Sequence, residues 1–495
     1  MTTSRLVHAI TLLAVFAMAA RISVDTDTWW HLRAGEWILE NRAILQVDVF
    51  SYTRAGAPWN YPGWLVELPM YLIYSVFGPG GLNLWTAAMV TLAFAFVWPA
   101  LSGGVFLRAF TVVLAAAASG VYWAARPYLV TFVLAAVFVW VLEDFRWRDR
   151  DRLWLLPLLM IVWANSHGGF AVGIILIGIY GLDFTIRWLG DRFYPGGRAQ
   201  ETHSVEQSGL SPKLRKLFLI GLLTLAAVAI NPSGPRMLLY PINTVSIGGL
   251  QDFIAEWQSP NFHETRVQPF LLLLLLTFGA VGSSGRRIQI SDFLLVAVFT
   301  TLSLVAARNI ALFAITAPLV LTRHAALLIS LAARRFGLKL KLTSGSGQSR
   351  IVGMLNLVIL AVLLAAVLIK AASVYPEPVN TAYFDETYPT AAVAYLNESN
   401  PEGRLFNSYN WGGYLVWSLP DYPVFIDGRT DLFNDELIDA WIQVIRAEDD
   451  WEDVIRSWDV HLVLLEPSYP LASQLRAEHW NILHEDAISV LFEKP

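Results

Sequence analysis

Long apolar runs separated by short polar segments dominate the first three-quarters of the chain. A helix needs about 20 apolar residues to cross a bilayer core of about 30 Å. The runs therefore predict a polytopic α-helical membrane protein with about eleven transmembrane helices. The predicted spans are 6–22, 82–101, 109–123, 128–142, 153–165, 170–189, 217–230, 269–282, 290–306, 310–321 and 351–371.

The apolar segment 64–77 fits either a span or a helix in the membrane interface: it is short, contains Glu67 and Pro69 and ends in the glycine-rich stretch 78–81. If this segment does not cross the membrane, the basic loops 146–152, 192–216 and 323–350 all lie on one side of it. By the positive-inside rule, that side is the cytoplasm. We therefore interpret it as a juxtamembrane helix. The segment after the last span is then extracytoplasmic.

The first apolar run has an alternative interpretation. Small residues around Ala19, just before Arg21, are typical of a cleaved signal peptide. A retained membrane helix is the preferred interpretation, because the polar residues at its outer end look functional.

Composition narrows the function classes. The chain is 55 % hydrophobic and 15 % charged, with a mean hydropathy of +0.49, whereas soluble domains carry about a quarter charged residues. This excludes a soluble globular enzyme and a disordered chain. The absence of cysteine excludes disulfide scaffolds, cysteine-bound zinc, iron–sulfur clusters and thiol nucleophiles.

Charge divides the chain into two parts. Residues 372–495 carry 22 acidic and 6 basic residues, whereas the preceding residues carry 18 acidic and 29 basic ones. We predict a transmembrane domain over 1–371, with a first outer loop over 23–81, and an extracytoplasmic domain over 372–495. An acidic soluble part also argues against a nucleic-acid partner.

The C-terminal segment alternates short apolar runs with helical patterns. Strands are predicted at 404–408, 423–427, 461–466 and 487–492, and helices at 411–417, 432–446 and 451–457. Such alternation is typical of an α/β domain with a small mixed sheet and helices packed against it.

Polar residues collect at the predicted outer ends of the spans. Ionisable groups near membrane depth are costly and usually line a pathway or a site; the alternative is that they cap helix ends. The candidates at these positions are Asp25, Asp27, Asp48, Arg126, Asn165, His167, Glu256, Arg308 and Asn309.

These residue types suit two kinds of chemistry. Asp25 and Asp27, two residues apart at a membrane exit, fit a divalent metal such as Mg or Mn, or a general base beside a hydrogen-bond acceptor. Arg126 and Arg308 fit phosphate, although arginines at such positions also reach for lipid headgroups. Together they predict a site for an amphiphile carrying a phosphate, such as a polyprenyl-phosphate-linked sugar.

The turn Asp427-Gly428-Arg429 at a predicted strand end presents two charges. It fits either an internal salt bridge or a substrate contact. The sequence contains no phosphate-binding loop, no dinucleotide fingerprint and no zinc-protease motif.

The order of parts resembles the GT-C superfamily of membrane glycosyltransferases. Asp25-Thr26-Asp27 with Trp29-Trp30 is similar to its acidic first-loop motif, whose aspartate acts as a base or contacts a metal. Arg126-Pro127 is similar to the arginine that opens a comparable helix in protein mannosyltransferases. The run from Tyr409 through Trp411 to Tyr414 is similar to the W-W-D-Y-G acceptor motif of oligosaccharyltransferases, but Asn410-Trp411 replaces its Trp-Asp order.

The set Asp-Thr-Asp-Thr-Trp-Trp-His-Leu, Arg-Asn and Phe-Ile-Asp-Gly-Arg also resembles a bacterial family of polytopic proteins in this superfamily. The resemblance implies transfer of a sugar from a polyprenyl-phosphate donor to an acceptor on the outer face of the inner membrane. Its partners would be membrane lipids and the lipid-linked sugar, with Tyr409, Trp411, Asp427 and Arg429 among the substrate-binding residues. The alternatives are a transporter or flippase for a lipid-linked saccharide, with polar residues at mid-membrane, and a non-catalytic assembly scaffold.

Overall fold

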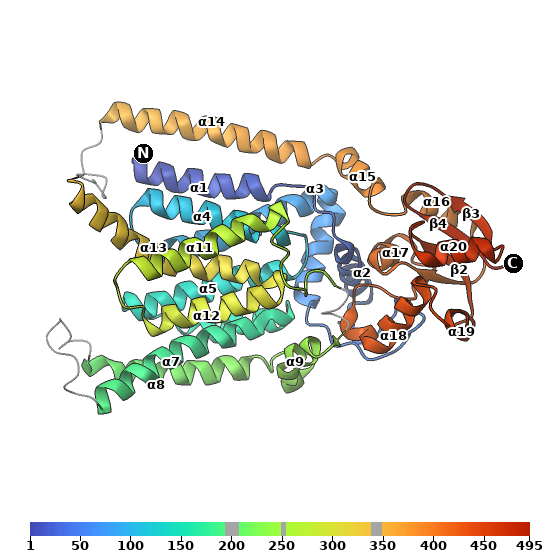
Figure 1. Cartoon of the computed structure of the whole chain (residues 1–495), viewed down its shortest axis with the longest axis horizontal. Coiled ribbons are helices and arrows are strands. Elements are labelled where there is room, and N and C mark those ends of the chain that lie inside the picture. The colour runs from blue at the N-terminus through green and yellow to red at the C-terminus, as the bar shows by residue number, and fades with distance from the viewer. Residues whose placement is uncertain (194–206, 249–253, 338–348) are drawn as a thin grey trace.

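The computed structural model describes residues 1–193, 207–248, 254–337 and 349–495. A bundle of apolar helices forms one end of the molecule and an α/β domain the other (Figure 1). Parts of the basic segments 192–216 and 323–350 lie outside the described residues. The bundle helices are α1 (Thr3–Ala19), α3 (Trp64–Val97), α4 (Val105–Ser119), α5 (Tyr128–Trp147), α6 (Leu155–Ala164), α7 (Ala171–Phe193), α8 (Gln207–Ala227), α11 (Gln268–Ser283), α12 (Ile290–Val305), α13 (Ile310–Arg335) and α14 (Arg350–Val374).

Each predicted span overlaps one of these helices. Within the described part of the chain, seven helical stretches are long and apolar enough to cross a membrane, and three shorter apolar helices accompany them. Apart from α14, which contributes Val374 alone, their side chains form one continuous apolar core. The chain is a multi-pass membrane protein.

Helix α3 is two helices joined at Gly78. This residue has φ +62° and lies between the segment that begins at Trp64 and the second half that begins at Pro79. Glycine adopts this conformation without the steric penalty that a Cβ would bring. The first half runs across the ends of the other bundle helices (Figure 1), as a juxtamembrane helix would.

The end of the bundle away from the α/β domain contains a buried ionic network. Arg323 on α13 pairs with Glu143 on α5 and with Asp292 on α12. Arg146 pairs with Asp183 on α7. Several charges at this basic end are therefore paired inside the protein, where they join four helices.

The α/β domain contains a four-stranded mixed sheet in the order β1-β2-β4-β3. Strands β1 and β2 are parallel, and β4 runs antiparallel to both of its neighbours. The mixed sheet predicted from the sequence is therefore confirmed. Its elements are β1 (Arg404–Asn407), β2 (Val460–Leu465), β3 (Asn481–Glu485), β4 (Val490–Glu493), α15 (Glu377–Asp385), α16 (Thr390–Ser399), α17 (Gly412–Ser418), α18 (Thr430–Ile445), α19 (Trp451–Ser457) and α20 (Pro470–Ala477).

The predicted strand 423–427 is wrong. Its backbone forms a single bridge to the first outer loop, where Val424 exchanges hydrogen bonds with Phe50 and Tyr52. The amide side chain of Asn407 pairs with the next two residues, accepting from the Phe425 N–H at 2.8 Å. These partners satisfy the backbone groups that a strand neighbour would otherwise bind.

The first outer loop packs into the α/β domain. Its helix α2 (Thr26–Asn41) lies between the first half of α3 and α17. Trp29 makes edge contacts with Tyr388 and Tyr414, whose rings stack at 4.6 Å. Because the loop and the domain share one apolar core, the loop is fixed in place rather than free over the membrane surface.

Candidate functional site

The start of α2 and the loop before α5 form one wall of the site. The Asp25 side chain caps α2, where Oδ1 accepts from the backbone N–H groups of Asp27 and Thr28. The Thr28 hydroxyl donates to the Ala125 carbonyl at 3.0 Å. These bonds bring the guanidinium of Arg126 between the two aspartates.

Arg126 binds three carboxylates at once. Its Nε donates to Asp25 at 2.6 Å, one terminal nitrogen contacts Asp27 at 2.8 Å, and the other contacts Glu256 at 3.2 Å. The second oxygen of Glu256 pairs with Arg308 at 3.2 Å. We name these five residues (Asp25, Asp27, Arg126, Glu256 and Arg308) the arginine–carboxylate cluster.

The loop before α13 supports the second half of the cluster. The backbone N–H groups of Ala307 and Arg308 donate to the carbonyls of Gln258 and Glu256, so the two loops run together. The Arg308 guanidinium lies over the Trp257 ring, 4.3 Å from its centroid. This stacking orients the arginine and leaves donors free, since Arg308 has one ion-pair partner in the described part of the chain.

The cluster is sheltered but reachable. The exposed fraction of its side chains runs from 17 % at Arg126 to 27 % at Arg308. Burial raises the pKa of Asp27 to about 7, against the opposing effect of Arg126. Burial also acts to raise the pKa of Glu256, but Arg126 and Arg308 hold it below its ordinary value. Asp27 is thus the carboxylate that can change protonation near neutral pH.

A turn of the α/β domain touches the cluster. A Cβ added to Gly428 would lie 1.8 Å from Oδ1 of Asp27, so no larger residue fits without moving the carboxylate. The Tyr409 side chain also faces this region: burial raises its pKa, and the charges of Asp27 and Asp427 raise it further. No local pattern in the chain indicated the contact between Gly428 and Asp27.

The charged pair on either side of Gly428 is buried. Arg429 donates from Nε and one terminal nitrogen to Asp427, and from the other terminal nitrogen to Asp48 at 2.5 Å. The side chains of Arg429 and Asp48 are fully buried, as is that of Asp427. These three predicted substrate contacts join the first outer loop to the α/β domain.

Three further predicted residues form hydrogen bonds within the protein. The Asn165 amide donates to the carbonyls of Ile161 and Ile230 and accepts from the Trp64 indole. The Asn309 side chain donates to the Leu302 carbonyl. Trp411 is buried, and its indole donates to the Thr387 carbonyl.

His167 has a defined tautomer. Its Nδ1 accepts from the Gly169 backbone N–H at 3.0 Å, so Nε2 carries the ring proton. Burial lowers the pKa of His167 to about 3, and the charges of Arg308 and Arg126 act in the same direction. The ring is therefore a neutral hydrogen-bond donor close to the two arginines.

The oxygens of the cluster do not fit a divalent metal. Mg²⁺ requires near-octahedral oxygen ligands at about 2.0–2.1 Å, and here the space between the three carboxylates contains a guanidinium. In the described part of the chain, no three His, Asp or Glu side chains are arranged to hold a metal.

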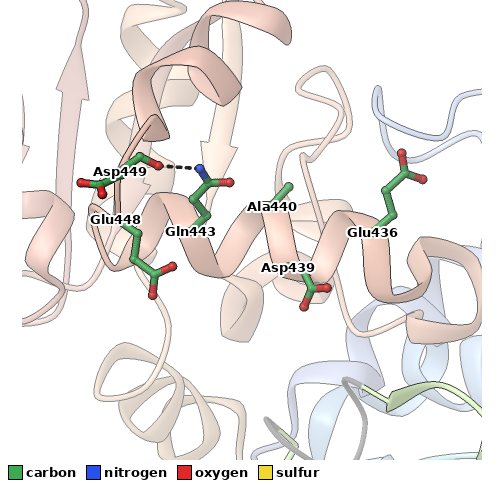
Figure 2. A pocket seen from close by; sticks show the side chains of 6 residues that line it. All are labelled: Glu436, Asp439, Ala440, Gln443, Glu448 and Asp449. Atoms are coloured by element: carbon green, nitrogen blue, oxygen red, sulfur yellow. Dashed lines mark hydrogen bonds between the residues drawn. The ribbon is translucent and has the colours of Figure 1, made fainter.

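A separate surface pocket lies on α18. It is lined by acidic and amide side chains, and Figure 2 shows that the Glu436 carboxylate points away from those of Asp439 and Glu448. Because the carboxylates do not converge, this pocket has no arrangement that would hold one ligand.

Comparison with solved structures identifies the fold. The oligosaccharyltransferase of Archaeoglobus fulgidus, solved with a tethered acceptor peptide, has a TM-score of 0.53 at 13 % identity, covering 94 % of this chain and 69 % of that one. The oligosaccharyltransferase AglB from the same organism, in complex with an inhibitory peptide and a dolichol-phosphate, has a TM-score of 0.54 at 12 % identity, covering 93 % of this chain and 69 % of that one. The GT-C-like fold predicted from the sequence is therefore confirmed.

Another solved structure is less similar in shape. ArnT of Cupriavidus metallidurans, bound to undecaprenyl phosphate, has a TM-score of 0.44 at 15 % identity, covering 99 % of this chain and 97 % of that one. Neither a protein-family model nor a curated protein matches the chain.

Proposed function

We propose that the chain is a glycosyltransferase that moves a sugar from a polyprenyl-phosphate donor to an acceptor on the outer face of a bacterial inner membrane. The observation that carries the proposal is the arginine–carboxylate cluster, which combines an acid of raised pKa with a partly free arginine. It lies between apolar helices and the α/β domain, where an amphiphilic donor and a polar acceptor can meet. The fold is that of an enzyme solved with a dolichol-phosphate and a peptide.

The two aspartates have different parts in this proposal. Asp27 is the general base, because a base is most effective with a pKa near the working pH. Asp25 is the positioning residue: its carboxylate caps α2 and fixes the Nε side of Arg126.

The two arginines also have different roles in this proposal. Arg126 is occupied by three carboxylates, so it organises the cluster. Arg308 has donors to spare and is the phosphate-binding residue. His167 adds a neutral Nε2–H donor near the same position.

The proposed reaction is one displacement. The acceptor hydroxyl attacks the anomeric carbon of the sugar while its proton passes to Asp27. The bond between that carbon and the phosphate oxygen breaks, and polyprenyl phosphate leaves with the electron pair. Arg308 stabilises the charge that develops on the leaving phosphate.

We further propose the sidedness predicted from charge. The ends of α7 and α13 and the start of α14 lie at the opposite end of the molecule from the α/β domain (Figure 1). If the basic end is cytoplasmic, the domain that begins near residue 372 and the cluster are extracytoplasmic.

The test is turnover of a panel of polyprenyl-phosphate sugars by the purified protein in lipid nanodiscs, followed as release of polyprenyl phosphate. Asp27→Asn should reduce release by about 10²–10⁴-fold, the usual contribution of a general base. Asp421→Asn, an exposed carboxylate of the α/β domain, is the matched control and should retain the wild-type rate. Equal rates for wild type and Asp27→Asn would remove the base assignment. Lipid flipping that survives this substitution, without release, would support the transporter alternative.

A further inference from the structure

Three carboxylates face one guanidinium in the cluster, and each nitrogen position of Arg126 has its own acid. Nε contacts Asp25, and the two terminal nitrogens contact Asp27 and Glu256. These acids come from the start of α2 and from the loop after residue 253, and the arginine precedes α5. A single planar cation therefore joins three separate segments.

The remaining carboxylate oxygens do not converge on a second point. Oδ1 of Asp25 already accepts two backbone N–H groups. Oδ1 of Asp27 lies against Gly428 of the α/β domain. The second oxygen of Glu256 contacts Arg308. An entering metal ion would have to displace Arg126 to gain three oxygens.

Charge also opposes entry of a metal. Two guanidinium groups balance two of the three carboxylates, so the cluster offers a doubly charged ion at most one unit of net negative charge. Sites that bind calcium or magnesium depend on several uncompensated oxygen ligands. The guanidinium, in contrast, stays charged at any working pH and presents its N–H donors in a fixed plane.

We infer that Arg126 takes the place of a divalent cation in this site: its guanidinium binds the three carboxylates together, keeps Mg²⁺ and Mn²⁺ out, and makes catalysis independent of divalent metal. The statement about catalysis rests on the proposed function, whereas the exclusion of metal does not. A lysine at position 126 cannot replace the arginine, because an ammonium is a point charge and cannot donate to three carboxylates that lie in one plane.

The exclusion is tested by Mn²⁺ binding, measured by the loss of the free-ion electron paramagnetic resonance signal. The full chain is used in phosphatidylcholine nanodiscs, whose neutral headgroups limit background binding. Surface acids of the α/β domain add the same background Mn²⁺ binding in all variants. The double variant Asp25→Asn/Asp27→Asn measures this background, because it lacks two of the three carboxylates of the cluster. Wild type should bind no more Mn²⁺ than this reference.

Arg126→Met should create a metal site, because it frees three carboxylates without removing one. Its Mn²⁺ affinity should exceed that of wild type at least about tenfold, as expected when uncompensated ligand charge increases. Arg308→Met is the matched control: it frees a single Glu256 oxygen and should gain no such site.

Stoichiometric Mn²⁺ binding by wild type that is lost in the double variant would overturn the inference, even if Arg126→Met cannot be folded. A folded Arg126→Met variant that gains no site would also overturn it, since the guanidinium would not be what excludes the ion. In the activity arm, donor turnover should be unchanged by a chelator. Turnover that is abolished by chelation and restored by Mn²⁺ would refute metal independence while leaving the glycosyltransferase proposal intact.

Discussion

The buried ion triad formed by Asp48, Asp427 and Arg429 gives the clearest quantitative prediction. We consider Arg429→Met, which keeps a long apolar side chain but removes the cation. In the native protein the guanidinium donates to both carboxylates, and all three side chains are shielded from water. It also lies 4.9 Å from the Trp59 ring centroid. The substitution leaves two carboxylates buried without a cation.

Removing one partner of a buried ion pair costs about 3–5 kcal/mol, mainly because the remaining charge stays desolvated. A loss of 1 kcal/mol lowers Tm by roughly 2–4 °C in a unit of 150–250 residues. We therefore expect the α/β domain together with the first outer loop to melt roughly 6–20 °C earlier. Thermal unfolding followed by tryptophan fluorescence is a suitable assay, since the chain contains 20 tryptophans.

Two variants make the result interpretable. Arg456→Met removes an exposed arginine from α19, where its pair with Asp453 is open to solvent, and exposed pairs contribute at most about 1 kcal/mol. Adding Asp48→Asn and Asp427→Asn to Arg429→Met should recover part of the loss, because no buried charge then remains unpaired. A Tm for Arg429→Met equal to that of Arg456→Met would show that the triad does not hold the loop to the domain.

Three further predictions concern the cluster. Gly428→Ala should reduce sugar transfer by about 10²-fold, because the added methyl group displaces Asp27. Gly120→Ala is the control and should match wild type, because a Cβ there would make only ordinary contacts. Equal rates for the two variants would contradict the contact between Gly428 and Asp27. Asp27 must be ionised to accept a proton, and its pKa is raised to about 7 by burial and by the charges of Asp25 and Glu256, against the opposing effect of Arg126. Transfer should therefore fall as the pH drops below about 7; a rate flat from pH 5 to 8, measured as initial velocity at saturating donor, would exclude Asp27 as the base. Arg308→Lys should lower kcat/KM for the donor through both a higher KM and a lower kcat, because Arg308 is assigned both to binding the phosphate and to stabilising the charge that develops on it; an unchanged kcat/KM would place the phosphate elsewhere.

The side of the membrane that a residue shares with others could be predicted from the sequence better than the residues that it contacts. The apolar runs and basic loops predicted that Asp25, Asp27, Arg126, Glu256 and Arg308 share one face of the membrane. They did not predict which acid meets which arginine. Asp25 and Arg126 are 101 residues apart, and Arg126 and Glu256 are 130 residues apart. Pairing over such separations depends on how the helices pack, which no local pattern encodes.

The α/β domain shows the same limit. The strand expected at 423–427 has the right apolar pattern, but its backbone partners come from the first outer loop and from Asn407. The helix α20 and the strand β3 were not predicted, because their short amphipathic runs resemble connecting segments. A strand is defined by its neighbour, and here the neighbour belongs to a distant part of the chain.

The order of residues along the chain is enough to predict a membrane protein, the positions of its apolar helices, the acidic character of its C-terminal domain and the face on which its polar residues gather. These follow from the free energy of burying apolar groups and from the cost of placing charge in lipid. Three features came from the folded arrangement: Arg126 lies between three carboxylates, Gly428 contacts Asp27, and Arg429 is buried with Asp48. Charges are stabilised by partners at a few ångströms, and folding brings together partners that are far apart in the chain.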